Sequence, residues 1–412
     1  MAELIAPDRA VELVLAHAAA LGAEAVPLDD ALDRVLATDA VSADAVPGFD
    51  NSAMDGYAVR AADTTGATPE APARLLIAGE SRAGHPAEEP VEPGAAARIS
   101  TGAMLPRGAD AVVRVEDTGE SGGSVQVYVA VEPGAEIRHR GDDILAGDVV
   151  LHGGASLGAA ELGVLASIGV AEASCVCKPR LALLMTGDEL RAPAEPLRPG
   201  MVRNTNAYSI AAQARQAGAH VTSRAIVPDD RSATTASLGR ALEADVVIVC
   251  GGMSVGRHDH VKPALAELGV EERFWGVALR PGKPTWFGLA HPDGAARPTL
   301  VFGLPGNPVS AMITFHLFVR PVLRALSGAV EVRERATAIM DEPYRKRAGR
   351  AHAVRCRAER GEDARWHVRP TKEQASHVLT SMLGADALAM IAIEREDVAA
   401  GEEVEIELLS RR

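Results

Sequence analysis

Two glycine-rich loops each follow a short apolar run and precede a segment with helix-like periodicity. They read GGMSVGRHD at 251–259 and GLPGNPVS at 303–310. Glycines let the backbone approach a ligand closely, and the free N–H groups and dipole of a helix N-terminus attract anions. Because the first loop also carries Ser254 and Asp259, the pair predicts a site for a phosphorylated ligand accompanied by a cation.

Carboxylates follow two other predicted strands of the same region. The first strand is followed by TGDEL at 186–190, and the second by Asp229 and Asp230. Mg²⁺ prefers a few carboxylates together with phosphate and water oxygens. A helix N-cap or a solvated turn is the ordinary structural alternative for both patterns. Their shared position at strand ends favours the ligand-binding interpretation.

Basic residues lie close to the same strand ends. Arg280 and Lys283 flank a rigid Pro-Gly turn after the fourth predicted strand, and Lys262 follows the first glycine loop. Two charges on a stiff turn suit a fixed anion, and a lysine neutralises phosphate as a point charge. The alternative is a surface turn with solvated cations.

A third group of motifs lies in a β-rich part of the chain. The segment FDNSAMDGYAV at 49–59 mixes small polar residues with two aspartates, which is poor as a strand core and favours a ligand-facing loop. ISTGA at 99–103 adds hydroxyls, and GDDI at 141–144 adds carboxylates. Each of these two, taken alone, is more typical of a structural turn.

Several common site types are disfavoured. The sequence contains neither the GxxxxGK[ST] pattern of P-loop NTPases nor a GxGxxG dinucleotide fingerprint. His258 and His260 flank Asp259 without a second ligand pair, which argues against a zinc site. No Ser-His-Asp or Cys-His nucleophile set stands out in the sequence.

The bulk properties indicate a multidomain protein without a general nucleic-acid-binding face. The chain has 412 residues and a net charge of −14, and this length suits roughly two to four domains. Its four cysteines are typical of reduced cytosolic thiols. We see no signal-peptide pattern and no uncharged apolar run of ~20 residues, so we expect a soluble cytoplasmic protein.

Helical periodicity marks three segments of the first 178 residues, 7–21, 28–36 and 156–170, and we expect these helices to pack together. The intervening region alternates short apolar runs with Gly/Pro turns, which predicts an inserted β-rich domain. Its expected strands are 74–77, 95–99, 111–115 and 125–131.

From residue 179, strand and helix patterns alternate. This predicts a mostly parallel, doubly wound sheet with ligands at the carboxyl ends of its strands. The expected strands are 181–185, 221–227, 245–250, 274–279 and 299–302, and the expected helices are 206–217, 231–243, 261–268 and 308–326. Beyond residue 328, strands at 354–357, 365–369 and 403–409 predict a small C-terminal β-domain.

These motifs, in this order, resemble the MoeA family of molybdopterin molybdenumtransferases, which includes the C-terminal part of gephyrin. FDNSAMDGYAV and GLPGNPVS are the most specific of them. The resemblance implies an elongated multidomain chain of the α/β plus β class. Its implied parts are a helical linking domain (1–45 and 146–178), an inserted β-domain (46–145), a doubly wound α/β domain similar to molybdopterin adenylyltransferases (179–328) and a C-terminal β-domain (329–412).

The resemblance also implies Mg²⁺-dependent insertion of molybdate into adenylylated molybdopterin, with hydrolysis of the phosphoanhydride and release of AMP. The implied catalytic residues are Asp55, Thr101 and Asp143 in the β-domain and Glu189, Asp229 and Asp259 in the α/β domain, the last three also holding the metal. The implied substrate-binding residues are Thr186, Gly187, Asp188, Gly251, Gly252, Ser254, Gly256, Lys262, Arg280, Lys283, Pro305, Gly306, Pro308 and Ser310.

A homodimer is implied as well, in which the β-domain of one subunit faces the α/β domain of the other. The implied partners are a molybdopterin adenylyltransferase and downstream molybdoenzymes, with no nucleic acid and no membrane. Arg280 departs from the lysine common in the family, and residues 392–395 replace its usual proline-containing segment.

Two alternatives stay open, a molybdopterin adenylyltransferase and a non-catalytic gephyrin-like scaffold. The intact β-domain motifs favour insertion over adenylylation, and the retained acids argue against a scaffold.

Overall fold

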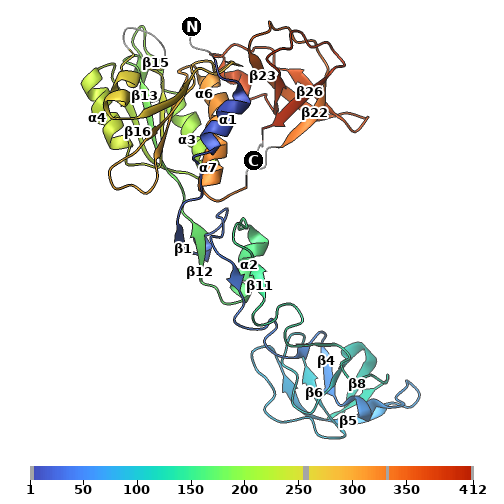
Figure 1. The fold of residues 1–412 in the computed structure, drawn as a ribbon. Helices are drawn as coiled ribbons and strands as arrows, with labels where there is room; N and C mark the ends of the chain where they lie inside the picture. Colours follow the sequence, from blue (N-terminus) through green and yellow to red (C-terminus); the bar gives the residue numbers. More distant parts are fainter. Residues whose placement is uncertain (1–3, 254–258, 331–333, 410–412) are drawn as a thin grey trace.

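The chain is elongated, with a β-domain at one end and two packed domains at the other (Figure 1). The computed structural model describes residues 4–253, 259–330 and 334–409. A narrow middle part joins the β-domain to the α/β domain and the C-terminal sheet, which lie side by side.

The β-domain is a six-stranded sheet in the order β7-β4-β6-β5-β9-β8. Its strands are β4 (Gly56–Val59), β5 (Ala73–Ser81), β6 (Ala95–Ile99), β7 (Ala111–Arg114), β8 (Thr118–Ser121) and β9 (Ser124–Val127), with 3-10 turns η2 (Ala61–Thr64) and η3 (Val115–Asp117) and the small pair β3 (Asn51–Ser52) and β10 (Ile137–Arg138).

The segment 49–59 differs from the sequence expectation, because its second half is a buried strand rather than a ligand-facing loop. All four residues of β4 are buried between β6 and β7. A Cβ on Gly56 would lie 1.9 Å from the carbonyl oxygen of Val113, so only glycine allows the two strands to approach this closely. The sequence reading missed the strand because small residues hide its apolar character.

The middle part contains less helix than expected. It holds the pairs β1 (Ala23–Pro27) with β12 (Glu172–Val176) and β2 (Ala40–Val41) with β11 (Val149–Leu151), the helix α2 (Ala159–Ser167) and the 3-10 turn η1 (Leu28–Asp30). Segment 28–36, expected as a helix, forms only this one turn. Leu36, Leu157 and Leu165 are buried together in a separate small core.

The N-terminal helix α1 (Pro7–Leu15) packs against the α/β domain instead of against α2. Its buried residues Ala10 and Val14 belong to the large core cluster that also contains Leu317 and Leu323. An amphipathic pattern predicts which face of a helix is buried, but not which neighbour covers it.

The α/β domain is built on a sheet in the order β16-β13-β17-β21-β20-β18, of which the first four strands are parallel. Its elements are β13 (Arg180–Thr186), β16 (His220–Val227), β17 (Val246–Cys250), β18 (Glu271–Trp275), β20 (Trp286–Ala290), β21 (Thr299–Leu304), α3 (Asn206–Gln216), α4 (Arg231–Ala241) and α5 (Val261–Glu267), with the short pair β14 (Leu190–Arg191) and β15 (Val202–Arg203).

The strand expected at 274–279 is divided between two sheets. β18 ends at Trp275 and pairs antiparallel with β20, whereas β19 (Leu279–Arg280) pairs with a strand of the C-terminal domain. Gly276, with φ of +88°, interrupts the apolar run at the point of division. The turn after Arg280 therefore follows a strand of the C-terminal sheet and not a strand of the parallel α/β sheet.

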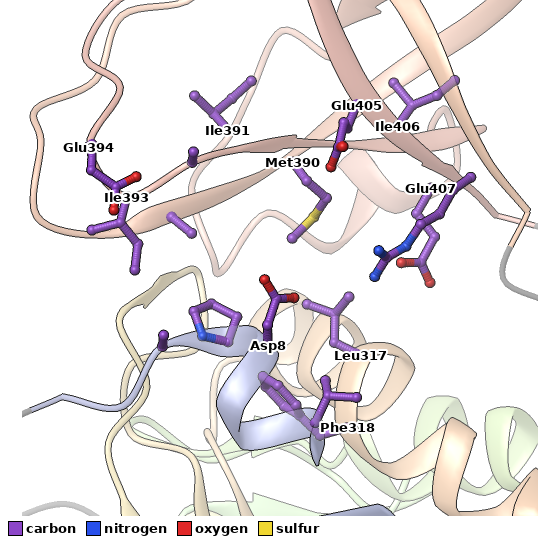
Figure 2. Close-up of a pocket in the computed structure, with 16 residues that line it drawn as sticks. Asp8, Leu317, Phe318, Met390, Ile391, Ile393, Glu394, Glu405, Ile406 and Glu407 are labelled. Atoms are coloured by element: carbon purple, nitrogen blue, oxygen red, sulfur yellow. The ribbon is translucent and has the colours of Figure 1, made fainter. Parts of the chain in front are cut away.

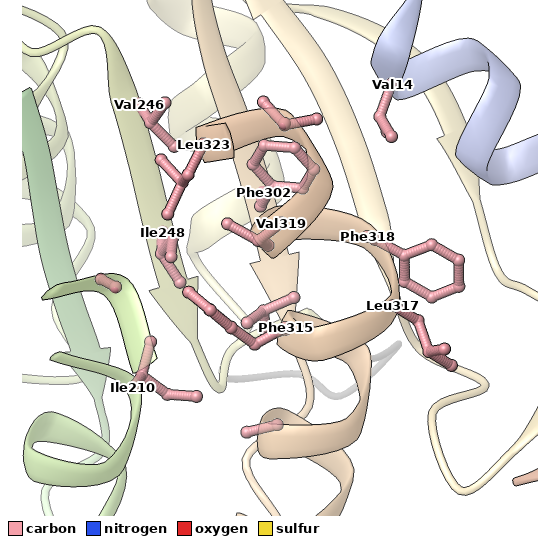
Figure 3. Packing of buried hydrophobic residues seen from close by; sticks show 14 of the residues in the cluster. Val14, Ile210, Val246, Ile248, Phe302, Phe315, Leu317, Phe318, Val319 and Leu323 are labelled. Carbon is pink, nitrogen blue, oxygen red and sulfur yellow. The ribbon is translucent and has the colours of Figure 1, made fainter. Parts of the chain in front are cut away.

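One continuous helical run, Pro308–Leu326, fills the centre of the α/β core. It consists of α6 (Pro308–Thr314), the π-turn η4 (Phe315–Val319) and α7 (Arg320–Leu326). Figure 3 shows Phe315, Val319 and Leu323 packed toward Val246 and Ile248 of β17. Among the described residues only this run has the length and apolar composition of a membrane span, yet 78% of it is buried in the protein, as in a core helix.

The C-terminal sheet has the order β19-β23-β24-β22-β26-β25, and an additional β23–β25 pairing closes it. Its strands beyond β19 are β22 (Arg335–Met340), β23 (Ala351–Arg360), β24 (Trp366–Pro370), β25 (Ala387–Ile391) and β26 (Glu403–Leu408), with the 3-10 turn η5 (Leu379–Met382). Strands β22 and β25 were not expected from the sequence.

Candidate functional site

A cavity of about 810 Å³ opens at the carboxyl ends of the parallel strands. It lies where the chain leaves β13, β16, β17 and β21, as expected for a doubly wound sheet. The predicted residues that line it are Thr186, Gly187, Glu189, Asp229, Gly251, Gly252, Asp259, Pro305, Gly306 and Pro308. We call this space the carboxylate cavity.

Three carboxylates from three strand ends face the carboxylate cavity. Glu189, Asp229 and Asp259 all line it. Asp188 instead fixes the turn, because its carboxylate accepts a hydrogen bond from the backbone N–H of Asp229 at 3.1 Å. Within the described part of the chain, no three His, Cys, Asp or Glu side chains lie close enough together to hold a metal by themselves.

This arrangement fits Mg²⁺ better than a metal that needs an all-protein cage. Mg²⁺ is commonly held by one or two carboxylates, with water and substrate phosphate oxygens completing its shell. Glu189, Asp229 and Asp259 around one cavity provide such a donor set. A phosphorylated ligand would have to supply the remaining oxygens.

The first glycine loop is packed tightly against the end of β13. Gly252 has a φ of +62°, and a Cβ there would lie 2.8 Å from the hydroxyl oxygen of Thr186. Glycine is therefore needed at this position for both conformation and space. The predicted binding residues Ser254 and Gly256 lie outside the described residues.

The second glycine loop is fixed by a residue that the sequence reading missed. The side-chain amide of Asn206 donates to the carbonyl oxygen of Gly306 at 2.8 Å. Asn206 also lines the carboxylate cavity, together with Arg203 and His377. The segment VRNTNAY at 202–208 leads into α3 but matches no general ligand-binding pattern, so no physical signal marked it.

A second cavity of about 380 Å³ adjoins the first and is lined by cations. Arg280, Lys283 and Arg350 contribute to it, together with Ser310 and Ser376. We call it the cationic cavity. The two cavities share four residues, Pro284, Pro305, Asn307 and His377. Arg350 and Ser376 come from the C-terminal domain, and the sequence reading did not assign them to the site.

The C-terminal domain is tied to the second glycine loop by two hydrogen bonds. The side-chain amide of Asn307 donates to Ser376 Oγ at 2.8 Å. The backbone N–H of Val309 donates to the carbonyl oxygen of Ser376 at 3.2 Å. This domain therefore forms one side of the cationic cavity.

A buried histidine lies behind the cationic cavity. His352 is 4% exposed, and its Nδ1 lies 3.0 Å from the hydroxyl oxygen of Tyr344. Burial, with a smaller contribution from nearby Arg280, Lys346 and Arg350, lowers the pKa of His352 to about 4. The imidazole is therefore neutral near pH 7 and adds no charge to the cations in front of it.

The sequence predicted that Lys262 contacts a phosphate. In the structure its neighbour is an aromatic ring. Its ammonium lies 4.1 Å from the centre of the Trp275 ring, a cation–π contact. Burial lowers the pKa of this lysine. Lys262 does not line either cavity among the described residues.

The predicted residues Asp55 and Thr101 contact each other in the β-domain, whereas Asp143 lies where the β-domain joins the middle part. Asp55 Oδ1 accepts hydrogen bonds from the backbone N–H of Thr101 at 2.7 Å and from its hydroxyl at 3.1 Å. Asp143 is exposed in the loop after β10. In one chain the sheet that positions Asp55 and Thr101 lies at the opposite end of the molecule from the carboxylate cavity (Figure 1).

A third cavity, of about 310 Å³, lies between α1, η4 and the C-terminal sheet. Figure 2 shows Asp8 of α1 and Met390 of β25 pointing toward each other across it, with Leu317 and Phe318 on the side of Asp8 and Glu394 farther to one side. None of the predicted site residues lines it. It is therefore an interdomain space away from the motifs that carry chemistry.

Three family profiles together match most of the chain. The MoeA N-terminal region (domain I and II) matches residues 5–169, a probable molybdopterin binding domain matches 182–325, and the MoeA C-terminal region (domain IV) matches 337–409. Their order along the sequence agrees with the order of the β-domain with its middle part, the α/β domain and the C-terminal sheet.

Curated relatives are similar over nearly the whole chain. A molybdopterin molybdenumtransferase of Haemophilus influenzae is 36% identical, covering 93% of both chains. Molybdopterin molybdenumtransferase 2 of Mycobacterium tuberculosis is 38% identical, covering 92% of this chain and 94% of its own. A crystal structure of a molybdopterin biosynthesis MoeA protein from Pyrococcus horikoshii is 32% identical, with a TM-score of 0.82 over 98% of this chain and 99% of that one.

Proposed function

The chain belongs to the MoeA family of molybdopterin molybdenumtransferases, and from this membership we propose that it inserts molybdenum into molybdopterin. The substrates are adenylylated molybdopterin and molybdate. Water attacks the phosphoanhydride and AMP leaves. The two dithiolene sulfurs bind molybdenum, and one molybdate oxygen leaves as water with the two thiol protons. The observation that carries the proposal is a cavity lined by carboxylates directly beside one lined by cations, both built from the motifs of the sequence.

The carboxylate cavity suits the nucleotide-linked phosphates only together with a cation. Glu189, Asp229 and Asp259 alone would repel a phosphoanhydride. Mg²⁺ bound to these carboxylates would neutralise the phosphate oxygens and the charge on the leaving AMP. The chain's own contribution is to orient the phosphates with the backbone of the two glycine loops and to position the attacking water with a free carboxylate.

The cationic cavity suits the molybdate oxyanion. Arg280, Lys283 and Arg350 supply positive charge, and Ser310 and Ser376 supply hydroxyl donors. A small dianion with several acceptor oxygens can accept from all of them. Because this cavity shares residues with the carboxylate cavity, an oxyanion held here would lie next to a substrate bound there.

We propose that the active protein is a homodimer with a composite site. Asp55, Thr101 and Asp143 cannot reach the carboxylate cavity of their own chain, because the middle part separates the two ends (Figure 1). Met54, next to Asp55 in the sequence, and Met104, three residues after Thr101, are exposed apolar side chains that a partner would cover. Support for the dimer is thus the elongated shape and this exposed surface.

A cytoplasmic location is part of the same proposal. A molybdopterin adenylyltransferase would supply the substrate there, and molybdoenzymes would take up the product.

Incubation of the purified chain with adenylylated molybdopterin tests the proposal. We expect AMP release that needs both Mg²⁺ and molybdate, and that stops when EDTA is added. Equal release without molybdate would indicate a simple hydrolase. Formation of adenylylated molybdopterin from ATP and molybdopterin would instead identify an adenylyltransferase.

A further inference from the structure

Trp275, the last residue of β18, is not among the site residues that the sequence predicted, yet it contacts the first glycine loop. Its indole N–H donates to the carbonyl oxygen of Met253 at 3.2 Å. Met253 directly follows Gly251 and Gly252, which line the carboxylate cavity. The indole therefore holds the chain at the point where it leaves this wall of the cavity.

The ring of the same tryptophan contacts the helix that follows the loop. The ammonium of Lys262, in the first turn of α5, lies 4.1 Å from the ring centre. This helix also packs against the start of the loop, because a Cβ on Gly252 would lie 2.6 Å from Cγ2 of Val261. One indole thus joins the start of the first glycine loop to the helix after it.

Met253, the residue that Trp275 holds, also joins the two glycine loops. Its side chain is 2% exposed and lies over Gly303, where a Cβ would be 2.0 Å from Cε of Met253. Two residues earlier, the backbone N–H of Gly251 donates to the carbonyl oxygen of Leu304 at 3.1 Å. A shift of Met253 would therefore move one loop relative to the other and change the positions of the backbone groups that a bound phosphate would meet.

We propose that Trp275 is a positioning residue for the carboxylate cavity. Its N–H holds the Met253 carbonyl and its ring holds Lys262, so that Gly252 and Asp259 keep fixed positions in the cavity wall. In the described part of the chain Trp275 lines neither cavity, so it acts through the loop. That the cavity binds the phosphate of a nucleotide rests on the proposed function, whereas the positioning of the loop does not.

The first test is binding of AMP, in the presence of Mg²⁺, to the full-length chain by calorimetry. Trp275→Phe keeps an aromatic ring for Lys262 but removes the N–H, and we expect it to raise the Kd for AMP roughly fivefold. Trp275→Leu removes both contacts and should raise the Kd roughly 20-fold. An unchanged Kd in both variants would overturn the proposal. Should Trp275→Leu fail to fold, an unchanged Kd in Trp275→Phe would overturn it in the same way.

Trp366→Phe is the matched control. Trp366 of β24 also carries a cation on its ring, with Cζ of Arg360 4.4 Å from the ring centre. It lies in the C-terminal sheet and, among the residues described, lines neither cavity. We expect a similar change in melting temperature to that of Trp275→Phe, but no change in the Kd for AMP. An equal rise in Kd would show that loss of stability is the cause, and would overturn the positioning role.

A double-mutant cycle tests the contact between the ring and Lys262. Lys262→Met alone should raise the Kd for AMP roughly threefold, because one of the two contacts of the indole is lost. In the Trp275→Leu chain the ring is already absent, so adding Lys262→Met should cost little more. Losses that multiply in the double variant would place Lys262 on the phosphate and contradict its role on the ring.

Hydrogen exchange separates this inference from the proposed function. The amide of Gly251 donates to Leu304 between the two glycine loops, so in Trp275→Phe its exchange should become faster, whereas in Trp366→Phe it should not. Unchanged exchange at Gly251 in Trp275→Phe would overturn the positioning role. A wild-type chain that neither binds AMP nor releases it would remove the proposed function, while the exchange result would still decide the role of Trp275.

Discussion

At the scale of single residues, the carboxylates at the strand ends carry the chemistry that we propose. We predict that Glu189→Gln and Asp259→Asn each lower molybdate-dependent AMP release by roughly 100-fold or more, because charge neutralisation at the phosphates is the main contribution to such a reaction. Glu243→Gln, at an exposed position at the other end of the sheet, is the control. Full AMP release in both site variants would contradict the role of this cavity.

His352 gives a second prediction at this scale, for stability against pH. Its pKa in the folded chain, about 4, lies below the ordinary value of 6.5. As the pH falls below 6.5, the unfolded chain takes up a proton that the folded chain does not, so stability is lost until about pH 4. This single group accounts for roughly 3 kcal/mol over that window.

We therefore expect His352→Gln to lose about 3 kcal/mol less than the wild type between pH 7 and pH 4, measured by urea unfolding at several pH values. His220→Gln, at an exposed histidine, controls for removal of an imidazole. An identical pH dependence in wild type and His352→Gln would show that the pKa of His352 is the same in the folded and the unfolded chain.

At the scale of elements, the β-domain depends on a close approach between two strands. Gly56→Ala would place a Cβ 1.9 Å from the carbonyl oxygen of Val113, so β4 and β7 would have to separate. We expect a loss of roughly 3 kcal/mol or more, as for other strained core changes, measured by denaturant unfolding.

The matched comparison is Gly163→Ala within α2. A Cβ there meets nothing within 4 Å, and alanine is the better helix former, so we expect a gain of about 0.5–1 kcal/mol. If both substitutions changed stability equally, local packing at Gly56 would not be the cause.

The sequence predicted some strands and helices accurately and others wrongly. Strands 181–185 and 221–227 and helix 231–243 were expected close to where they occur, because apolar runs and periodicity report burial directly. Strand 274–279 was wrong, because one apolar run supplies strands to two different sheets.

At the scale of the whole molecule, the β-domain and the carboxylate cavity are at opposite ends of one chain. The composite-site proposal predicts complementation between inactive variants. When equal amounts of Asp55→Asn and Glu189→Gln chains are mixed and re-associate, about half of the dimers are heterodimers. Each heterodimer has one intact site, so we expect about a quarter of wild-type AMP release.

The control mixes Glu189→Gln with Asp259→Asn, whose changes fall in the same half of the site. This mixture should stay inactive, because every site in the heterodimer would carry one change. No recovery in the first mixture, with dimers demonstrated by light scattering, would contradict a site shared between subunits.

The sequence by itself indicated the chemistry that we propose for this protein. The glycine loops, the strand-end acids and the basic Pro-Gly turn are local patterns, and local backbone physics fixes what each can do. These motifs occur in the family's order along most of the chain, and that order was enough to indicate the family.

Only the tertiary structure decided which residues meet. Arg350, Ser376 and Asn206 belong to the cavities because β23 and α3 bring distant segments against the glycine loops. Lys262 contacts the ring of Trp275 for the same reason, since Lys262 lies on α5 and Trp275 lies on β18. Contacts between elements depend on packing across long sequence separations, and no local pattern of residue types encodes that.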